Sequence, residues 1–271
     1  MNKHSLTLFR QQFASHYKTI LLWTVVWSLL ALLFVSVFND LSKTAAQSIR
    51  LYQSLPPAIL NTFNISSDYL TKSEKFLSGQ FLTIYLLAGG VFSVFIGVGS
   101  VGGKLDNATI ATFLTKPISR VSFYITELLT SAATMLTVSA TVGIIMYGLF
   151  ATLANQPSVS AQYFVAAFLG SGCLFVTLAI FGQALGTLLN RTHAQAVGAA
   201  LVVFSFFVNG LGSLAGVPAW LQKVSIFYYL DTTQIRDLYS LNGGRLWVLG
   251  VVSLVFLVIG TLWFRRKDIY I

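Results

Sequence analysis

The chain has 271 residues, of which 55% are hydrophobic and only 9% are charged, and its formal net charge is +9. Because a soluble domain carries about 25% charged residues, this composition excludes a water-soluble globular protein and indicates one that crosses a membrane several times. The positive charge is typical of the cytoplasmic side of such a protein and does not indicate nucleic-acid binding.

The first segment, residues 1–18, predicts an amphipathic helix at the inner membrane interface. Its apolar residues recur at three- and four-residue spacing, as on one face of a helix. These residues are Leu6, Phe9, Phe13 and Tyr17. A frayed tail is the alternative. The apolar run that follows is longer than the core of a cleaved signal peptide, which has about 7–15 residues, so we expect it to remain as the first span.

Six apolar runs reach the length of about 20 residues that a membrane-spanning helix needs. They cover residues 20–38, 81–102, 123–153, 163–189, 194–214 and 246–264. The predicted fold is therefore an all-α polytopic membrane protein with six transmembrane helices, formed by a single transmembrane domain over residues 1–271. The longer connections, residues 39–80 and 215–245, are predicted to be outer loops that contain short extracellular helices.

The basic residues predict the orientation of the spans. If the N-terminus lies inside, the inner segments hold ten of the seventeen Lys and Arg residues. These ten are Lys3, Arg10, Lys18, Lys104, Lys116, Arg120, Arg191, Arg265, Arg266 and Lys267. Because basic residues cross the membrane poorly during insertion, both termini are predicted to be cytoplasmic. The expected location is the cell membrane, and in particular a bacterial plasma membrane.

The sequence holds no pattern of catalytic or metal-ligating residues. The three histidines have no neighbour at ligand spacing, and no GxSxG, HExxH or P-loop is present. Glu127 is the only acid inside a predicted span. We expect it to pair with Lys116 or Arg120 rather than to carry an ion. The chain is therefore predicted to be neither an enzyme nor a metal-binding protein.

The inner segment 103–122 is the most informative polar stretch of the sequence. Within it, "KLDNATIATFLTKPISR" can form a short helix that Asp106 or Asn107 caps and Pro117 ends. Two apolar faces are predicted on this helix. One face carries Leu105, Thr109, Thr112 and Phe113, and the other carries Ile110, Leu114 and Pro117. Two such faces suit contact with membrane on one side and protein on the other, and an ordinary polar loop is the alternative.

This segment resembles the one that follows the second span in ABC-2 type permeases. The matching runs, in order, are Asp106, Ala108-Thr109-Ile110, Phe113-Leu114-Thr115 and Pro117-Ile118-Ser119-Arg120. The runs "NRTHAQAVG", "PAWLQKVSIFYYLD" and "FRRKDIY" agree with the six-span layout of that family, so the resemblance covers nearly the whole chain. Three positions depart from it: Ala108 replaces the usual glycine, Lys104 stands where an acid is common, and Glu127 stands where a lysine is common.

The resemblance implies a permease subunit of an ABC exporter. Such a subunit pairs with a second permease, identical or different, and binds two copies of a separate cytoplasmic ATPase. The residues implied to contact the ATPase are Leu105, Asp106, Thr109, Thr112, Phe113, Lys116 and Arg120, with Arg191 as a secondary contact. ATP and Mg would bind to that ATPase, so no cofactor is expected on this chain. Membrane lipids are expected to surround it.

Phe204, Phe207 and Asn209 in the fifth predicted span indicate an apolar substrate path. Such a path favours an amphipathic or hydrophobic substrate, such as a peptide, a drug or a lipid. Packing in the core or against lipid is the alternative. Two other functions also fit the sequence: a membrane-embedded sensor or assembly protein that anchors an ATPase without transport, and an ion-driven carrier. ATPase-dependent flux in vesicles would separate the first from an exporter, and dependence on an ion gradient without ATP would identify the second.

Overall fold

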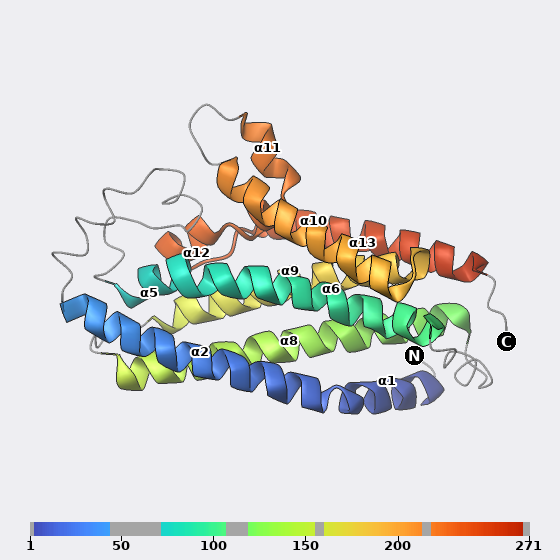
Figure 1. Ribbon diagram of the computed structural model, residues 1–271, viewed down its shortest axis with the longest axis horizontal. Coiled ribbons are helices and arrows are strands. Elements are labelled where there is room, and N and C mark those ends of the chain that lie inside the picture. Colours follow the sequence, from blue (N-terminus) through green and yellow to red (C-terminus); the bar gives the residue numbers. More distant parts are fainter. Residues whose placement is uncertain (1–2, 44–71, 107–118, 155–159, 213–217, 268–271) are drawn as a thin grey trace.

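The computed structural model describes residues 3–43, 72–106, 119–154, 160–212 and 218–267, and every regular element in these ranges is a helix (Figure 1). Six helical segments are long and apolar enough to cross a membrane. They contain α2 (Tyr17–Lys43), α6 (Leu82–Asp106), α8 (Arg120–Leu153), α9 (Ala161–Leu188), α10 (Arg191–Leu211) and α13 (Gly243–Arg266). The prediction of an all-helical protein with six helices of spanning length is thereby confirmed for the described residues, with helix ends that extend up to eight residues beyond the predicted ones.

Shorter helices complete the described chain. They are α1 (Lys3–Ser15), α5 (Ser73–Phe76), a π-helix η1 (Leu77–Phe81), α11 (Ala219–Val224), a 3-10 helix η2 (Ile226–Leu230) and α12 (Thr232–Leu238). The short helices predicted within residues 215–245 are therefore present. Because α2 ends at Lys43 and α5 begins at Ser73, the described parts of the predicted loop 39–80 are helical except for Lys72. The helices predicted within its central part, residues 44–71, lie outside the described residues.

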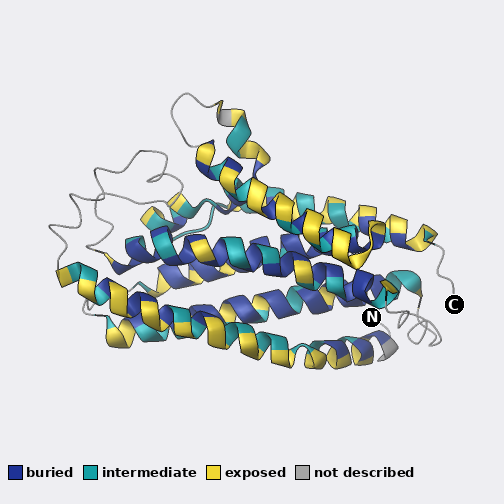
Figure 2. Ribbon diagram, in the orientation of Figure 1, coloured by how far each residue is buried: buried dark blue, intermediate teal, exposed yellow. Residues whose placement is uncertain are grey.

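Helices α6 and α9 form the centre of the bundle. Helix α9 packs against α6, α8 and α13, while α10 packs on α6 and α2 packs on α8. In the most apolar stretch of each helix, 72% of the residues of α9 are buried, compared with 11% for α13 and 17% for α2. Figure 2 shows the same division between the central and the outer helices. The exposed apolar faces of the outer helices suit contact with lipid.

Glycines allow α6 and α9 to approach closely. A Cβ atom on Gly97 would overlap the backbone carbonyl of Ala179, and one on Gly182 would overlap the carbonyl of Val94. Small residues at a helix interface bring the two backbones together and so increase van der Waals contact. A larger side chain at either glycine would therefore push the two central helices apart.

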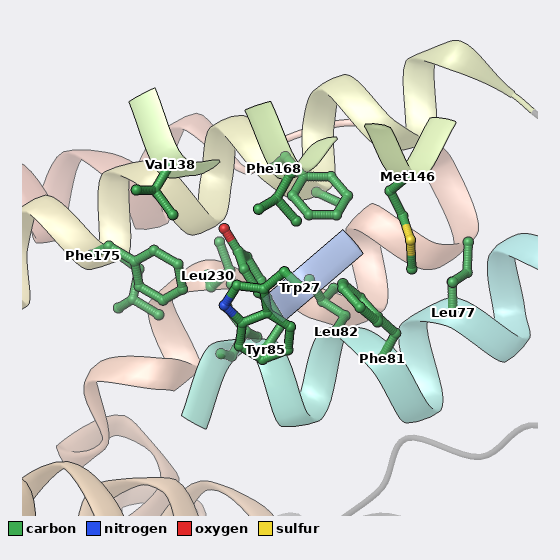
Figure 3. Close-up of a cluster of buried hydrophobic side chains, with 14 of the residues drawn as sticks. Trp27, Leu77, Phe81, Leu82, Tyr85, Val138, Met146, Phe168, Phe175 and Leu230 are labelled. Atoms are coloured by element: carbon green, nitrogen blue, oxygen red, sulfur yellow. The ribbon is translucent and has the colours of Figure 1, made fainter. Parts of the chain in front are cut away.

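A large aromatic cluster ties α2 to this centre. The ring of Trp27 on α2 lies 4.9 Å from that of Tyr85 on α6, and Tyr85 lies 5.2 Å from Phe175 on α9, as measured between ring centroids. Figure 3 shows Trp27 beside Tyr85 in this cluster. All three rings are buried and are nearly perpendicular or steeply inclined to one another. Such edge-to-face pairs are favourable beyond the area that they bury.

The described parts of the two termini lie at the same end of the bundle (Figure 1). We call this the basic end, because most of the described Lys and Arg residues lie there. They are Arg10, Lys18, Lys104, Arg120, Arg191, Arg265, Arg266 and Lys267. A second apolar cluster at this end packs Leu8 of α1 with Phe123 of α8 and Phe264 of α13.

At the opposite end, a local polar network holds the start of α13. The Nε atom of Arg245 lies 3.4 Å from Oδ2 of Asp231, and the guanidinium group stacks 4.1 Å from the ring centroid of Tyr228. Asn242 donates from Nδ2 to Asp231 Oδ2 at 3.1 Å, and its Oδ1 accepts from Arg245 N at 3.2 Å. Asn242 therefore caps α13 and fixes the preceding turn at the same time.

Candidate functional site

The segment predicted to contact an ATPase begins and ends at the basic end. Leu105 and Asp106 are the last residues of α6, and Arg120 is the first residue of α8. The predicted contact residues Thr109, Thr112, Phe113 and Lys116 lie outside the described residues. The structure therefore places the end of α6 and the start of α8, which flank residues 107–118, at the bundle end that carries the basic residues.

A buried ion pair joins α6 and α8 just inside this segment. Lys104 Nζ lies 2.5 Å from Glu127 Oε2, with 18% and 2% of the two side chains exposed. The Lys104 ammonium also lies 5.6 Å from the ring centroid of Phe123, which is within the range of a cation–π contact. The second carboxylate oxygen, Glu127 Oε1, is buried and accepts no hydrogen bond from the described residues. The pair therefore links two helices across the interior of the bundle.

This pairing differs from the prediction that Glu127 contacts Lys116 or Arg120. Helices α6 and α8 run antiparallel, and so Lys104 comes to face Glu127 across their interface. Arg120 lies two turns before Glu127 and makes a different contact, described below. Lys116 lies outside the described residues. The physical reason for the difference is tertiary packing, which sequence distance does not reveal.

Arg120 connects α8 to the end of α13. Its guanidinium donates from Nη1 to the carbonyl oxygen of Lys267 at 2.8 Å. The Lys267 ammonium in turn donates to the carbonyl oxygen of Thr187 at 2.7 Å, near the C-terminal end of α9. A cation at this position satisfies a carbonyl that has no partner within its helix and complements the helix dipole. Three helices are thus linked through two basic side chains.

Asp106 connects α6 to α10. Its Oδ2 atom accepts from the backbone N–H of Arg191 at 2.7 Å, at the first residue of α10. A carboxylate at a helix N-terminus satisfies a free N–H group and interacts favourably with the helix dipole. Arg191, the predicted secondary contact, has an exposed side chain. The structure therefore brings one predicted primary contact, Asp106, next to the predicted secondary contact.

Helix α1 packs along α8 at the basic end, and its existence confirms the predicted N-terminal helix. Ser5 Oγ lies 3.0 Å from Ser122 Oγ, and Leu8 is 3% exposed. Two residues of the predicted apolar face, Leu6 and Tyr17, remain exposed. The helix thus has one face on the protein and another that is free to meet a membrane surface.

His16 follows α1 and is partly buried. Its Nδ1 atom is shielded from solvent and has no hydrogen-bond partner among the described residues. Burial and the nearby charge of Lys104 lower the pKa of His16 below its ordinary value of 6.5. His16 is therefore neutral near pH 7 while α1 stays packed in place.

Gln183 was not among the predicted site residues. It is fully buried on α9 and donates from Nε2 to the carbonyl oxygen of Tyr124 at 2.9 Å. A glutamine within an apolar run of the sequence is the signal that could have identified it, because an amide in a membrane interior needs a partner. Gln183 fixes α9 to α8 one turn before Glu127.

The three residues of the predicted substrate path lie on α10 and differ in their burial. Phe204 and Phe207 are 64% and 51% exposed on α10, while Asn209 is half-buried. Phe204 lines a shallow groove of about 240 Å³ together with Phe181, Ile226 and other side chains, but Phe207 and Asn209 do not line it. Among the described residues, no group of three or more His, Cys, Asp or Glu side chains could hold a metal ion.

The described residues form a helical protein with six candidate membrane-spanning helices and a basic end. The sequence matches the family described as Multidrug efflux system permease Rv1217c, C-terminal domain, over residues 9–265, from α1 to the last turn of α13. The chain therefore belongs to this family and is an ABC-2 type permease-like domain. It is a membrane component of an efflux system, with a transport role rather than a catalytic one. No curated protein matches the chain.

Proposed function

We propose that this chain is the permease subunit of an ABC exporter that moves amphipathic or hydrophobic compounds across the bacterial plasma membrane. The observation that carries the proposal is the family match over residues 9–265, which places the chain among multidrug efflux permeases. In this proposal a second permease, identical or different, completes the pathway. A separate cytoplasmic ATPase, present in two copies, binds ATP and Mg and supplies the energy.

The orientation follows from the distribution of charge. The basic end would face the cytoplasm, because Lys and Arg residues are retained on that side during insertion. Both termini would then be cytoplasmic, and the network around Asp231 and Arg245 would lie outside the cell. The basic end would also meet the anionic lipids of the inner leaflet, which attract Lys and Arg side chains.

Contact with the ATPase would be made by the segment that joins α6 to α8. Its proposed contact residues are Leu105, Asp106, Thr109, Thr112, Phe113, Lys116 and Arg120, with a secondary contact at Arg191. The hydrogen bond between Asp106 and the Arg191 N–H supports this proposal, because it brings the primary and secondary contacts to one surface. An ATPase that displaces the segment would therefore act on α6, α8 and α10 at the same time.

The exposed aromatic face of α10 would line the substrate path. Phe204 and Phe207 point away from the bundle, so that in a pair of permeases they could face the second subunit. Aromatic rings offer large apolar contacts without a fixed pattern of hydrogen bonds, which suits substrates of varied structure. Asn209, near the end of the same helix, would add one polar contact.

The test is ATP-driven export in reconstituted vesicles. The chain is purified with the ATPase that accompanies it, and uptake of ethidium into inside-out vesicles is measured with and without ATP. We expect uptake that requires ATP and stops with vanadate. Replacing Phe113→Asp together with Thr109→Arg should lower ATP-driven uptake at least about tenfold, because these changes put charge on the proposed contact face.

The matched control is Lys43→Ala, which changes an exposed residue at the opposite end of the bundle. It should transport like the unmodified protein. Full ATP-driven uptake in the Phe113→Asp/Thr109→Arg variant would contradict the proposed contact. Uptake driven by an ion gradient in the absence of ATP would contradict the exporter itself.

A further inference from the structure

Charged contacts fix both ends of the segment that joins α6 to α8. Lys104 and Asp106 precede residues 107–118, and Ser119 and Arg120 follow them. Each of the three charged side chains contacts a helix other than its own. The two helices that flank the segment, α6 and α8, are therefore both joined to the rest of the bundle by these contacts.

The ion pair between Lys104 and Glu127 is the most deeply buried of these contacts. Only 2% of the Glu127 side chain is exposed, and Phe123 covers one side of the Lys104 ammonium. A buried charge that loses its partner is strongly unfavourable, since it can no longer be solvated. Helices α6 and α8 therefore cannot slide apart at this point without leaving two buried charges unpaired.

We propose that Lys104 and Glu127 are positioning residues that make α6 and α8 move as one unit when the segment 107–118 is displaced. The proposal rests on the proposed function, in which an ATPase displaces this segment. With the pair intact, a displacement of the segment moves both helices together. Without the ion pair, the same displacement distorts the contact between α6 and α8 and does not move the membrane-spanning helices. ATP is then hydrolysed without export.

A charge-exchange experiment tests the proposal. The variants are Lys104→Glu, Glu127→Lys and the double variant that carries both changes, each purified with its ATPase and reconstituted in vesicles. We measure ethidium exported per ATP hydrolysed. Each single change should lower this ratio at least about tenfold, because two like charges then face each other in a buried site. The double variant should return to within about threefold of the unmodified protein.

The ratio separates a positioning role from a purely structural one. If the pair only stabilised the fold, export and ATP hydrolysis would fall together, in proportion to the folded protein, and the ratio would not change. That result would overturn the proposal, as would a double variant as impaired as the single ones. Lys43→Glu, which puts like charges at an exposed pair on one helix, is the matched control and should leave the ratio unchanged.

Two neutral variants cover the case in which charge reversal prevents folding. Lys104→Met and Glu127→Gln each remove one charge at similar size and should lower the ratio by about threefold or more. An unchanged ratio in both would overturn the proposal. Failure of the proposed function would look different, because the unmodified protein would then show no ATP-driven export. The melting temperatures of the single and double variants would still show whether the two charges stabilise the fold through their attraction to each other.

Discussion

The charged pairs at the basic end and the network around Arg245 at the opposite end join different parts of the chain. At the basic end, polar contacts join helices that are far apart in the sequence, as in the pairs Lys104–Glu127 and Arg120–Lys267. At the opposite end, the network around Arg245 connects residues 228–245, which are close in the sequence. The pairs at the basic end therefore join separate helices, whereas this network fixes one local segment of the chain.

The charged pairs at the two ends also differ in how far their side chains are buried. The Lys104–Glu127 side chains are 18% and 2% exposed, and the Arg245–Asp231 side chains are 30% and 11% exposed. A third pair, Lys43–Asp40, lies on one helix at the opposite end and is 66% and 80% exposed. Since solvent screens exposed charges, the three pairs should differ in their effect on stability, and the difference can be measured.

The largest effect is expected from Glu127→Leu. This change leaves the Lys104 ammonium in a largely buried site without its counter-charge, so the free energy of unfolding should fall by about 3 kcal/mol. Chemical unfolding in detergent micelles measures it. The double variant Lys104→Met/Glu127→Leu should regain most of the loss, because an apolar pair needs no counter-charge. A double variant less stable than Glu127→Leu would show that the ion pair is not the cause.

A smaller effect is expected from Asn242→Ala at the opposite end. It removes the cap of α13 and one hydrogen bond to Asp231, so the free energy of unfolding should fall by about 1–2 kcal/mol. Hydrogen exchange should become faster around the start of α13 and stay unchanged in α1 and the end of α6. Faster exchange at both ends would contradict the local character of this network.

The effect of pH on α1 should be smaller still. Because the pKa of His16 is lowered in the folded protein, the unfolded segment binds a proton more readily than the folded one. The stabilisation is therefore fully present above about pH 6.5 and is lost as the pH falls below that value. Hydrogen exchange of α1 between pH 5 and 8 measures it, and His16→Gln should remove this dependence. The same pH dependence in His16→Gln would assign it to another group.

The smallest effect is expected from Lys43→Ala. Both members of the Lys43–Asp40 pair are exposed, so the free energy of unfolding should change by no more than about 0.5 kcal/mol. Chemical unfolding in the same detergent gives the comparison with Glu127→Leu. A loss as large as that of Glu127→Leu would contradict the argument that burial decides the strength of these pairs.

Much of the fold could be predicted from the sequence, because long apolar runs and the period of the helix are local signals. The helix ends were less predictable. Helix α5 begins at Ser73, before the apolar run, and within it Glu74 is buried and its Oε1 accepts from the backbone N–H of Ser160 at 3.0 Å. A carboxylate in a polar stretch gives no sign of such a partner, which lies 86 residues away in the sequence.

The candidate site shows the same limit. The resemblance implied ATPase contacts at Asp106, Arg120 and Arg191, and the structure places all three at the basic end. The sequence did not reveal that Lys104 is the partner of Glu127, because this contact depends on how α6 and α8 pack against each other. The roles of Thr109, Thr112, Phe113 and Lys116 remain predictions.

The glycine contacts between α6 and α9 limit how this protein can change shape. Their backbones touch at Gly97 and Gly182, and even a small separation would lose these contacts without replacing them. A change of shape that keeps these contacts must therefore leave α6 and α9 together and move the outer helices relative to them. Spin labels on α6 and α9 should keep a constant distance throughout the transport cycle, while the distance between labels on α2 and α13 changes.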